Sequence, residues 1–160
     1  MNLNELASEC HEIARDKGFW DGIEPLDGSE PDDKQWRKIA EQVNHVLGEL
    51  GEAMTEDYGP KHLEELADAA IVLLDLCQFL GLEPSWPEND LYPIPAWHSL
   101  SRFANSLRKE GLANTGYLTN MAQHIIRDLD TVSGYCLVAE MREKMAFNRQ
   151  RPHKYGVHDG

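Results

Sequence analysis

The chain has 160 residues, which fits one domain with a sizeable core, and 41% of them are hydrophobic. It carries 28 acidic and 15 basic residues, a formal net charge of −13. That charge argues against non-specific binding to a nucleic acid polymer or an anionic membrane. The most apolar run, residues 69–82, is interrupted by Asp75 and Gln78 and is too short to span a bilayer.

Apolar residues recur at helical spacing along nearly the whole chain, and no run alternates as a half-buried strand does. The sequence therefore predicts an all-α helical bundle. Gly18 and Gly81 mark helix ends, and Pro60 suits the first turn of a helix. Two loops rich in Pro, Gly and Asp, residues 19–33 and 82–95, separate groups of helices. The predicted helices span about residues 4–17, 34–55, 60–80, 96–110, 115–130 and 133–149.

We expect a single domain over residues 1–160. It contains a helical hairpin at about 34–81, a second hairpin at about 96–134, and a basic C-terminal helix and tail, 135–160. A shift of 53 residues without a gap brings matching residues of the two hairpins together, including Asp75 with Asp128 and Gly81 with Gly134. The second hairpin is either a degenerate copy of the first or a chance match between amphipathic helices.

Three cysteines, Cys10, Cys77 and Cys136, lie far apart in the chain, and no CxxC spacing is present. The first ten residues, MNLNELASEC, contain acids and lack the apolar segment of a signal peptide. We therefore expect reduced, buried thiols in a cytoplasmic protein.

The stretch GELGEAMTEDYGPKHLEELADAA contains two matched pairs of acids, Glu49 with Glu52 and Glu65 with Asp68. Residues three apart share a helix face, and both pairs lie roughly 7 to 12 Å from the turn between their helices at about 1.5 Å per residue. An antiparallel hairpin would bring these four carboxylates together. They would repel one another unless a cation compensates, and oxygen ligands of this kind suit Mg²⁺ or Mn²⁺.

Two other interpretations of these acids remain open. They form a solvated acidic stripe, or they hold a di-iron centre, which would require Glu-x-x-His pairs that the sequence lacks. Glu56 and Glu64 lie outside the matched pairs and are expected to tolerate replacement. His45 lies four residues before Glu49, and Asp75 lies seven residues after Asp68, so each shares nearly the same helix face as its acid. Each residue either supports the site or lies at the edge of the core.

GELGEA followed by EELADAAIVLLDL resembles the ExxE…ExxD signature of the all-α nucleoside triphosphate pyrophosphohydrolases, the MazG-like group. HEIARDKGFWD and KMAFNRQRPHKYG are similar to the flanks of phage and bacterial members. The resemblance covers about residues 3–83 and 138–156. One position departs from the pattern: Gly48 stands where the family often has an acid, which leaves one auxiliary acid fewer.

The resemblance implies Mg²⁺-dependent cleavage of a nucleoside triphosphate between its α and β phosphates, with Mn²⁺ as a substitute metal. Glu49, Glu52, Glu65 and Asp68 would hold the metal, which neutralises phosphate charge and lowers the pKa of a bound water. Glu52 is the candidate for the catalytic carboxylate that orients this water. The substrate would be a nucleoside triphosphate, and a deoxynucleotide is favoured. Members of the family are usually oligomeric, so the resemblance also implies a homodimer.

The substrate-binding candidates lie near both ends of the chain. Lys144, Asn148 and Arg151 share one face if the last helix reaches that far. By resemblance, Lys144 and Arg151 would hold phosphates and Asn148 would contact sugar or phosphate, while Trp20 would stack on the base. The alternatives are a basic helix end that satisfies the helix dipole and an aromatic packed on the core. The rival function is a non-catalytic helical module that binds a protein partner.

Overall fold

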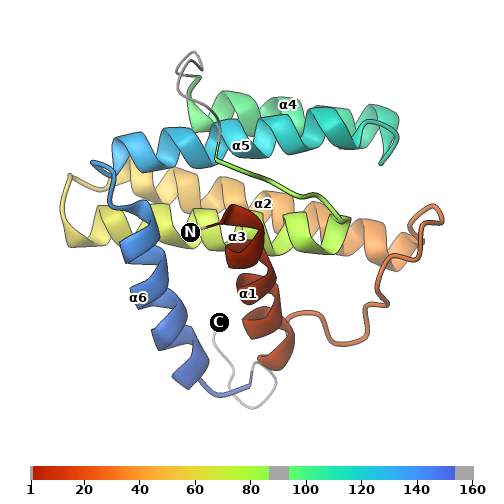
Figure 1. Cartoon of the computed structure of the whole chain (residues 1–160), viewed down its shortest axis with the longest axis horizontal. Coiled ribbons are helices and arrows are strands. Elements are labelled where there is room, and N and C mark those ends of the chain that lie inside the picture. Colours follow the sequence, from red (N-terminus) through yellow and green to blue (C-terminus); the bar gives the residue numbers. More distant parts are fainter. Residues whose placement is uncertain (1, 87–93, 154–160) are drawn as a thin grey trace.

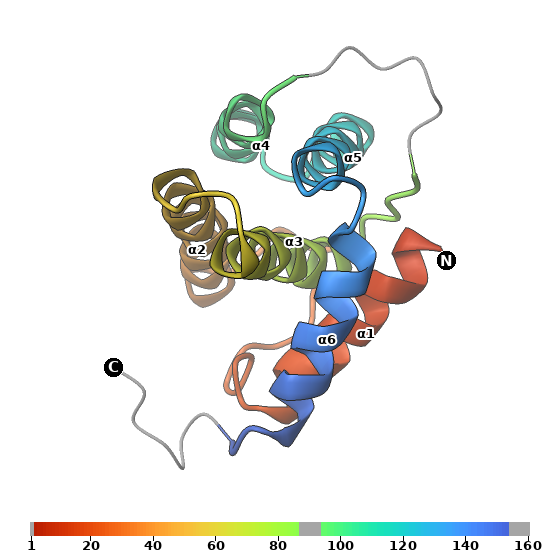
Figure 2. The ribbon, with the colours of Figure 1, turned by 90° about the vertical axis from the view of Figure 1, so that its left-hand side faces the viewer.

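The computed structural model describes residues 2–86 and 94–153, and within them the chain forms six α-helices and no strand. The helices stack in three layers of two (Figure 1), and the view from the end shows the same order (Figure 2). The all-α class is thus confirmed. The helices are α1 (Leu3–Asp16), α2 (Asp33–Thr55), α3 (Pro60–Leu80), α4 (Ala96–Glu110), α5 (Thr115–Val132) and α6 (Leu137–Gln150).

Helix α3 occupies the centre of the molecule. It pairs with α2 in the middle layer, α1 and α6 cross it on one side, and α5 lies on the other (Figures 1 and 2). Its buried residues are mostly apolar, because neighbouring helices cover several of its faces; Leu66, Leu73, Leu74 and Leu76 are all buried. Even so, no helix in the described part of the chain is long and apolar enough to cross a membrane.

The ends of the first hairpin follow from local chemistry. Asp32 and Gln35 form a reciprocal capping box that starts α2. Pro60 opens α3 at a position where its missing N–H costs nothing. Gly81 ends α3 in the left-handed conformation, with φ of 75°. These signals fix the two helices that carry the acids, and their bounds lie within one residue of the predicted ones.

Helices α4 and α5 form the second hairpin, which packs on the first. Shifted by 53 residues, α3 would cover residues 113–133, close to the bounds of α5. Gly81 and Gly134, which this shift pairs, are both left-handed, with φ of 75° and 72°. Helix α2, shifted in the same way, would begin at residue 86, whereas α4 begins at Ala96, so the match is confined to α3 and α5 and the duplication stays a prediction.

The last helix starts later than predicted. The sequence pattern suggested about residue 133, whereas α6 begins at Leu137. Gly134 and Tyr135 adopt positive φ values of 72° and 66°, which a right-handed helix does not allow. The turn they form redirects the chain from α5 into α6, across α3. Residues 154–160 of the predicted tail lie outside the described residues.

The expectation of three buried thiols is wrong for one of them. Cys10 and Cys77 are buried in the core, and burial raises the pKa of the Cys77 thiol to about 12. Cys136 is exposed, because it precedes α6 in the turn rather than lying on a core-facing helix position.

Candidate metal centre

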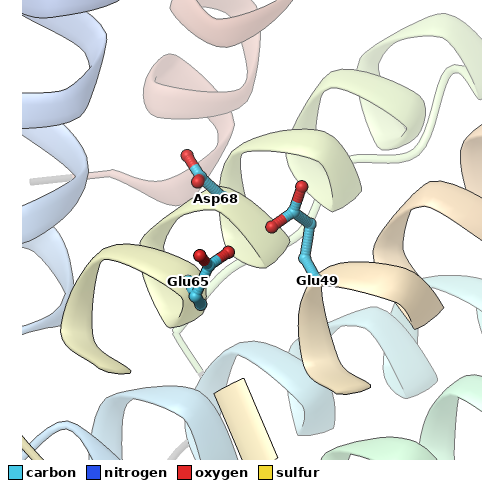
Figure 3. A group of neighbouring side chains, drawn as sticks. All are labelled: Glu49, Glu65 and Asp68. Atoms are coloured by element: carbon cyan, nitrogen blue, oxygen red, sulfur yellow. The ribbon is translucent and has the colours of Figure 1, made fainter. Parts of the chain in front are cut away.

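Three of the four predicted acids converge where α2 lies beside α3. Glu49 comes from α2, and Glu65 and Asp68 come from α3 (Figure 3). Each offers a carboxylate oxygen, and these oxygens all lie within 4.8 Å of one another. The antiparallel hairpin is the cause, because it places residues on either side of the turn at one height. The site therefore offers carboxylate oxygens, the donor type that Mg²⁺ and Mn²⁺ bind, close enough together to form a candidate metal centre.

Glu52 lies at the solvent edge of this group. It is exposed and hydrogen-bonded to Glu65. That shared hydrogen bond, followed by the negative charges of Glu49 and Glu65, raises the pKa of Glu52. The fourth acid thus belongs to the cluster electrostatically but is not one of the three converging carboxylates.

Burial and neighbouring charges shift the pKa values of Glu65 and Asp68. Burial raises the pKa of Asp68 to about 7, Glu49 and Glu65 add to the rise, and Lys144 opposes it. Burial also acts to raise the pKa of Glu65, but hydrogen bonds with Glu49, Lys61 and Glu52 outweigh it and bring this pKa to about 2. The buried Oε2 atom of Glu49 has no hydrogen-bond partner.

Basic side chains stand next to each of the three converging acids. His45 Nε2 lies 3.2 Å from Glu49, and Lys61 Nζ lies 2.8 Å from Glu65. These pairs satisfy part of the negative charge within the protein itself. An acid cluster with its own counterions is also what a site without any metal would contain, so the geometry alone leaves both interpretations open.

Lys144 of α6 is the third of these cations. Its Nζ lies 3.7 Å from Asp68 and 2.8 Å from Glu64. The structure therefore brings this predicted phosphate-binding residue to the acids. It also shows that Glu64, expected to stand apart from the site, holds Lys144 in place. Glu64 is consequently unsuitable as an inert control position.

The other two predicted residues of α6 lie beyond Lys144. Asn148 is one turn further along, and its buried Oδ1 atom has no hydrogen-bond partner among residues 2–86 and 94–153. Arg151 follows the last residue of α6, with its guanidinium carbon 6.0 Å from the centre of the Phe147 ring. The Lys144 ammonium lies 5.3 Å from the same ring.

Trp20 is packed in the core. It is 5% exposed, and its ring stacks on Phe79 with the centroids 4.3 Å apart. Lys38 Nζ lies 5.5 Å from the centre of the Trp20 ring. This is the core-packed alternative that the sequence left open. A base could stack on Trp20 only after Phe79 or Lys38 moved away, so that role stays a prediction.

Asp75 of α3 lies in the core, seven residues after Asp68. It is 4% exposed, and it accepts hydrogen bonds from Trp20 Nε1 and Gln42 Nε2, each at 2.9 Å. His11 Nδ1 lies 2.7 Å from the same carboxylate. Burial raises the pKa of Asp75, and its partners oppose that rise. The sequence indicated the position of Asp75 near the site but not these partners, which come from distant segments.

A large cavity lies elsewhere, between α1, the loop after it, α2 and the end of α4. Its volume is about 2040 Å³, and its lining includes Trp36, Ile39 and Leu107. Of the eight predicted site residues, all of which the structure describes, Trp20 alone lines it. The acids are thus outside this cavity, and their chemistry does not depend on it.

No family model, curated protein or solved structure matches the chain.

Proposed function

We propose that the protein is a Mg²⁺-dependent nucleoside triphosphate pyrophosphohydrolase, which cleaves between the α and β phosphates to give a monophosphate and pyrophosphate. The observation that carries this proposal is the convergence of Glu49, Glu65 and Asp68 within 4.8 Å, on two facing helices. The motif resemblance supplies the reaction, and the position of Lys144 beside Asp68 supports it.

The donor set fits a divalent metal. All of the ligands would be carboxylate oxygens, which Mg²⁺ and Mn²⁺ prefer. Glu49 Oε2 is buried without a hydrogen-bond partner, and burial holds the pKa of Asp68 near 7. A cation would coordinate that oxygen. It would also offset the desolvation cost of the buried carboxylates and their mutual repulsion. Glu49, Glu65 and Asp68 would hold the metal, with Glu52 at the solvent edge, and the bound metal would supply a more acidic water.

The other residues bind and orient the substrate in this proposal. Lys144 exchanges Asp68 and Glu64 for phosphate oxygens, since its ammonium already lies in the site. Glu52 is exposed and carries a raised pKa, so it can accept a hydrogen bond or a proton from the attacking water. Asn148 Oδ1, which has no hydrogen-bond partner, can accept one from a sugar hydroxyl. Arg151 adds charge for the phosphates.

The competing proposal is a non-catalytic helical module that binds a protein partner. It is favoured by the counterions already paired with the acids and by exposed apolar side chains on the hairpin, among them Leu47, Met54 and Tyr58. Under this proposal the acids form an ordinary charged surface. The two functions differ in a measurable product.

Incubation with mixed deoxynucleoside triphosphates and Mg²⁺ is expected to release pyrophosphate, since a metal held by the acids is needed to neutralise the substrate. Excess chelator should abolish the release, and added Mg²⁺ or Mn²⁺ should restore it. Chromatography of single nucleotides would then identify the preferred base. Full turnover in excess chelator would contradict the metal centre, and no pyrophosphate from any nucleotide would favour the partner-binding module.

A cytoplasmic homodimer is also part of the proposal. The exposed apolar residues near the tip of the first hairpin, Met54 and Tyr58, offer a surface that association would cover. Sedimentation at micromolar concentration is expected to give twice the chain mass. A monomer with full activity would reject the dimer and favour a second hairpin that replaces a partner subunit.

A further inference from the structure

Lys61 reaches from solvent into the acid cluster. It stands in the first turn of α3 with 59% of its side chain exposed, yet its Nζ lies 2.8 Å from Oε1 of Glu65. The Glu65 side chain is only 5% exposed. An exposed, flexible side chain thus supplies the positive charge to a buried carboxylate that the proposed function assigns to the metal.

Helix energetics do not account for the position of Lys61. A lysine four residues before a glutamate has the less favourable order for a pair within a helix. A positive charge in the first turn also opposes the positive end of the helix dipole. Lys61 therefore gains little from its own helix, and its attraction to the acid cluster holds the ammonium where it is.

Lys61 is also the most exposed of the three side chains that pair with the acids. The exposed fraction of its side chain is 59%, compared with 46% for His45 and 18% for Lys144. An ion pair made by an exposed side chain contributes little free energy to stability. The side chain can leave its partner readily, because water replaces the lost contact. Its partner atom belongs to a proposed metal ligand, so a metal on Glu65 and the Lys61 ammonium would compete.

We propose that Lys61 is a built-in counterion of the metal-free centre, which a divalent cation displaces from Glu65 and which then pairs with a phosphate of the substrate. This inference rests on the proposed function. It explains how a chain with a net charge of −13 can hold a polyphosphate: the metal neutralises the acids and leaves the freed ammonium as excess positive charge.

The proposal predicts that replacing Lys61 raises the affinity of the protein for one ligand and lowers its affinity for another. Lys61→Met removes the competitor and a repelling charge, so Mn²⁺ alone should bind about threefold to tenfold more tightly. The same change removes a partner of the phosphate. The affinity of the Mn²⁺-loaded protein for tripolyphosphate should therefore fall by about threefold to tenfold. Lys61→Arg keeps the charge and should stay within about twofold of wild type for both ligands.

Both affinities can be measured without turnover. Free Mn²⁺ is followed by electron paramagnetic resonance, and tripolyphosphate binding to the Mn²⁺-loaded protein is followed by calorimetry. Lys34→Met is the matched control: Lys34 is the second residue of α2, as Lys61 is of α3, and it is exposed at the far end of the hairpin. Neither affinity should change in this control.

The outcomes separate the inference from the proposed function. Unchanged or weaker Mn²⁺ binding by Lys61→Met, while wild type binds Mn²⁺, overturns the counterion role and leaves the metal centre in place. Tighter Mn²⁺ binding with unchanged tripolyphosphate binding overturns the transfer to phosphate. No Mn²⁺ binding by wild type overturns the metal centre and the inference together.

Discussion

Replacing Glu49 or Glu65 by glutamine is expected to lower kcat for pyrophosphate release at least about a hundredfold, because the change removes charge that holds the metal while keeping the side-chain size. Glu65 is the stronger test. It is nearly fully buried, and it is one of the three acids whose carboxylate oxygens converge. The measurement is pyrophosphate release at saturating Mg²⁺ for each purified variant. We expect the same loss for Glu52→Gln and Asp68→Asn.

Stability measurements distinguish this loss from unfolding. In chelator, Asp68→Asn should be more stable than wild type above about pH 7, because the pKa of Asp68 is raised from 3.8 to about 7. A raised carboxyl pKa means that its charge destabilises the fold. This cost is complete above pH 7 and disappears as the pH falls towards 4. The gain of the variant in thermal midpoint should follow the same pH course.

Glu56→Gln is the control for the acid replacements. Glu56 is exposed where α2 ends, so its replacement should leave kcat within about twofold of wild type. Glu64 cannot serve this purpose, because it holds Lys144. Wild-type turnover by both Glu49→Gln and Glu65→Gln, or equal sensitivity at Glu56, would rule out the proposed centre.

Asp75→Ala is expected to give the largest loss of stability, about 3 kcal/mol, because it leaves several buried donors without an acceptor. Trp20 and Gln42 each donate to this carboxylate, and His11 lies 2.7 Å from it. The loss should appear as a lower urea midpoint with an unchanged dependence on denaturant concentration. Trp20 fluorescence should shift towards that of a solvated indole.

The paired position in the second hairpin provides the comparison. Asp128 accepts one hydrogen bond, from the backbone N–H of Ala96 at 2.7 Å, and is only partly buried. Asp128→Ala should therefore cost about 1 kcal/mol. If the two replacements cost the same, Asp75 would not be the anchor that its contacts indicate.

The helices could be predicted from the sequence because their signals are local. Pro60 and Gly81 bracket α3, and a capping box starts α2, so neither helix depends on distant segments for its bounds. The start of α6 could not be predicted in this way. The positive φ values of Gly134 and Tyr135 exclude a helix there, and the value at Tyr135, a non-glycine residue, has no signal in the sequence.

The same distinction applies to the site. The three converging acids follow from spacing and one turn, both of which are visible in the sequence. The pair of Lys61 and Glu65 could also have been found, since the residues are four apart on one helix. The burial of Trp20 and its bond to Asp75 could not, because they depend on how α1 crosses α3, and no local signal sets that crossing.

The packing of α1 beside α6 on one side of α3 has a consequence for biosynthesis. Helices α1 and α6, which stand side by side there, are separated by most of the chain, and Arg149 of α6 pairs with Glu9 of α1 (Figure 1). The two hairpins can form on the ribosome from neighbouring segments, since local contacts form first. Lys144 reaches Asp68 only after α6 has been made. A product truncated before α6 would thus keep the hairpin and its pair of Lys61 with Glu65 but would lack Lys144, the cation that faces Asp68 from another helix.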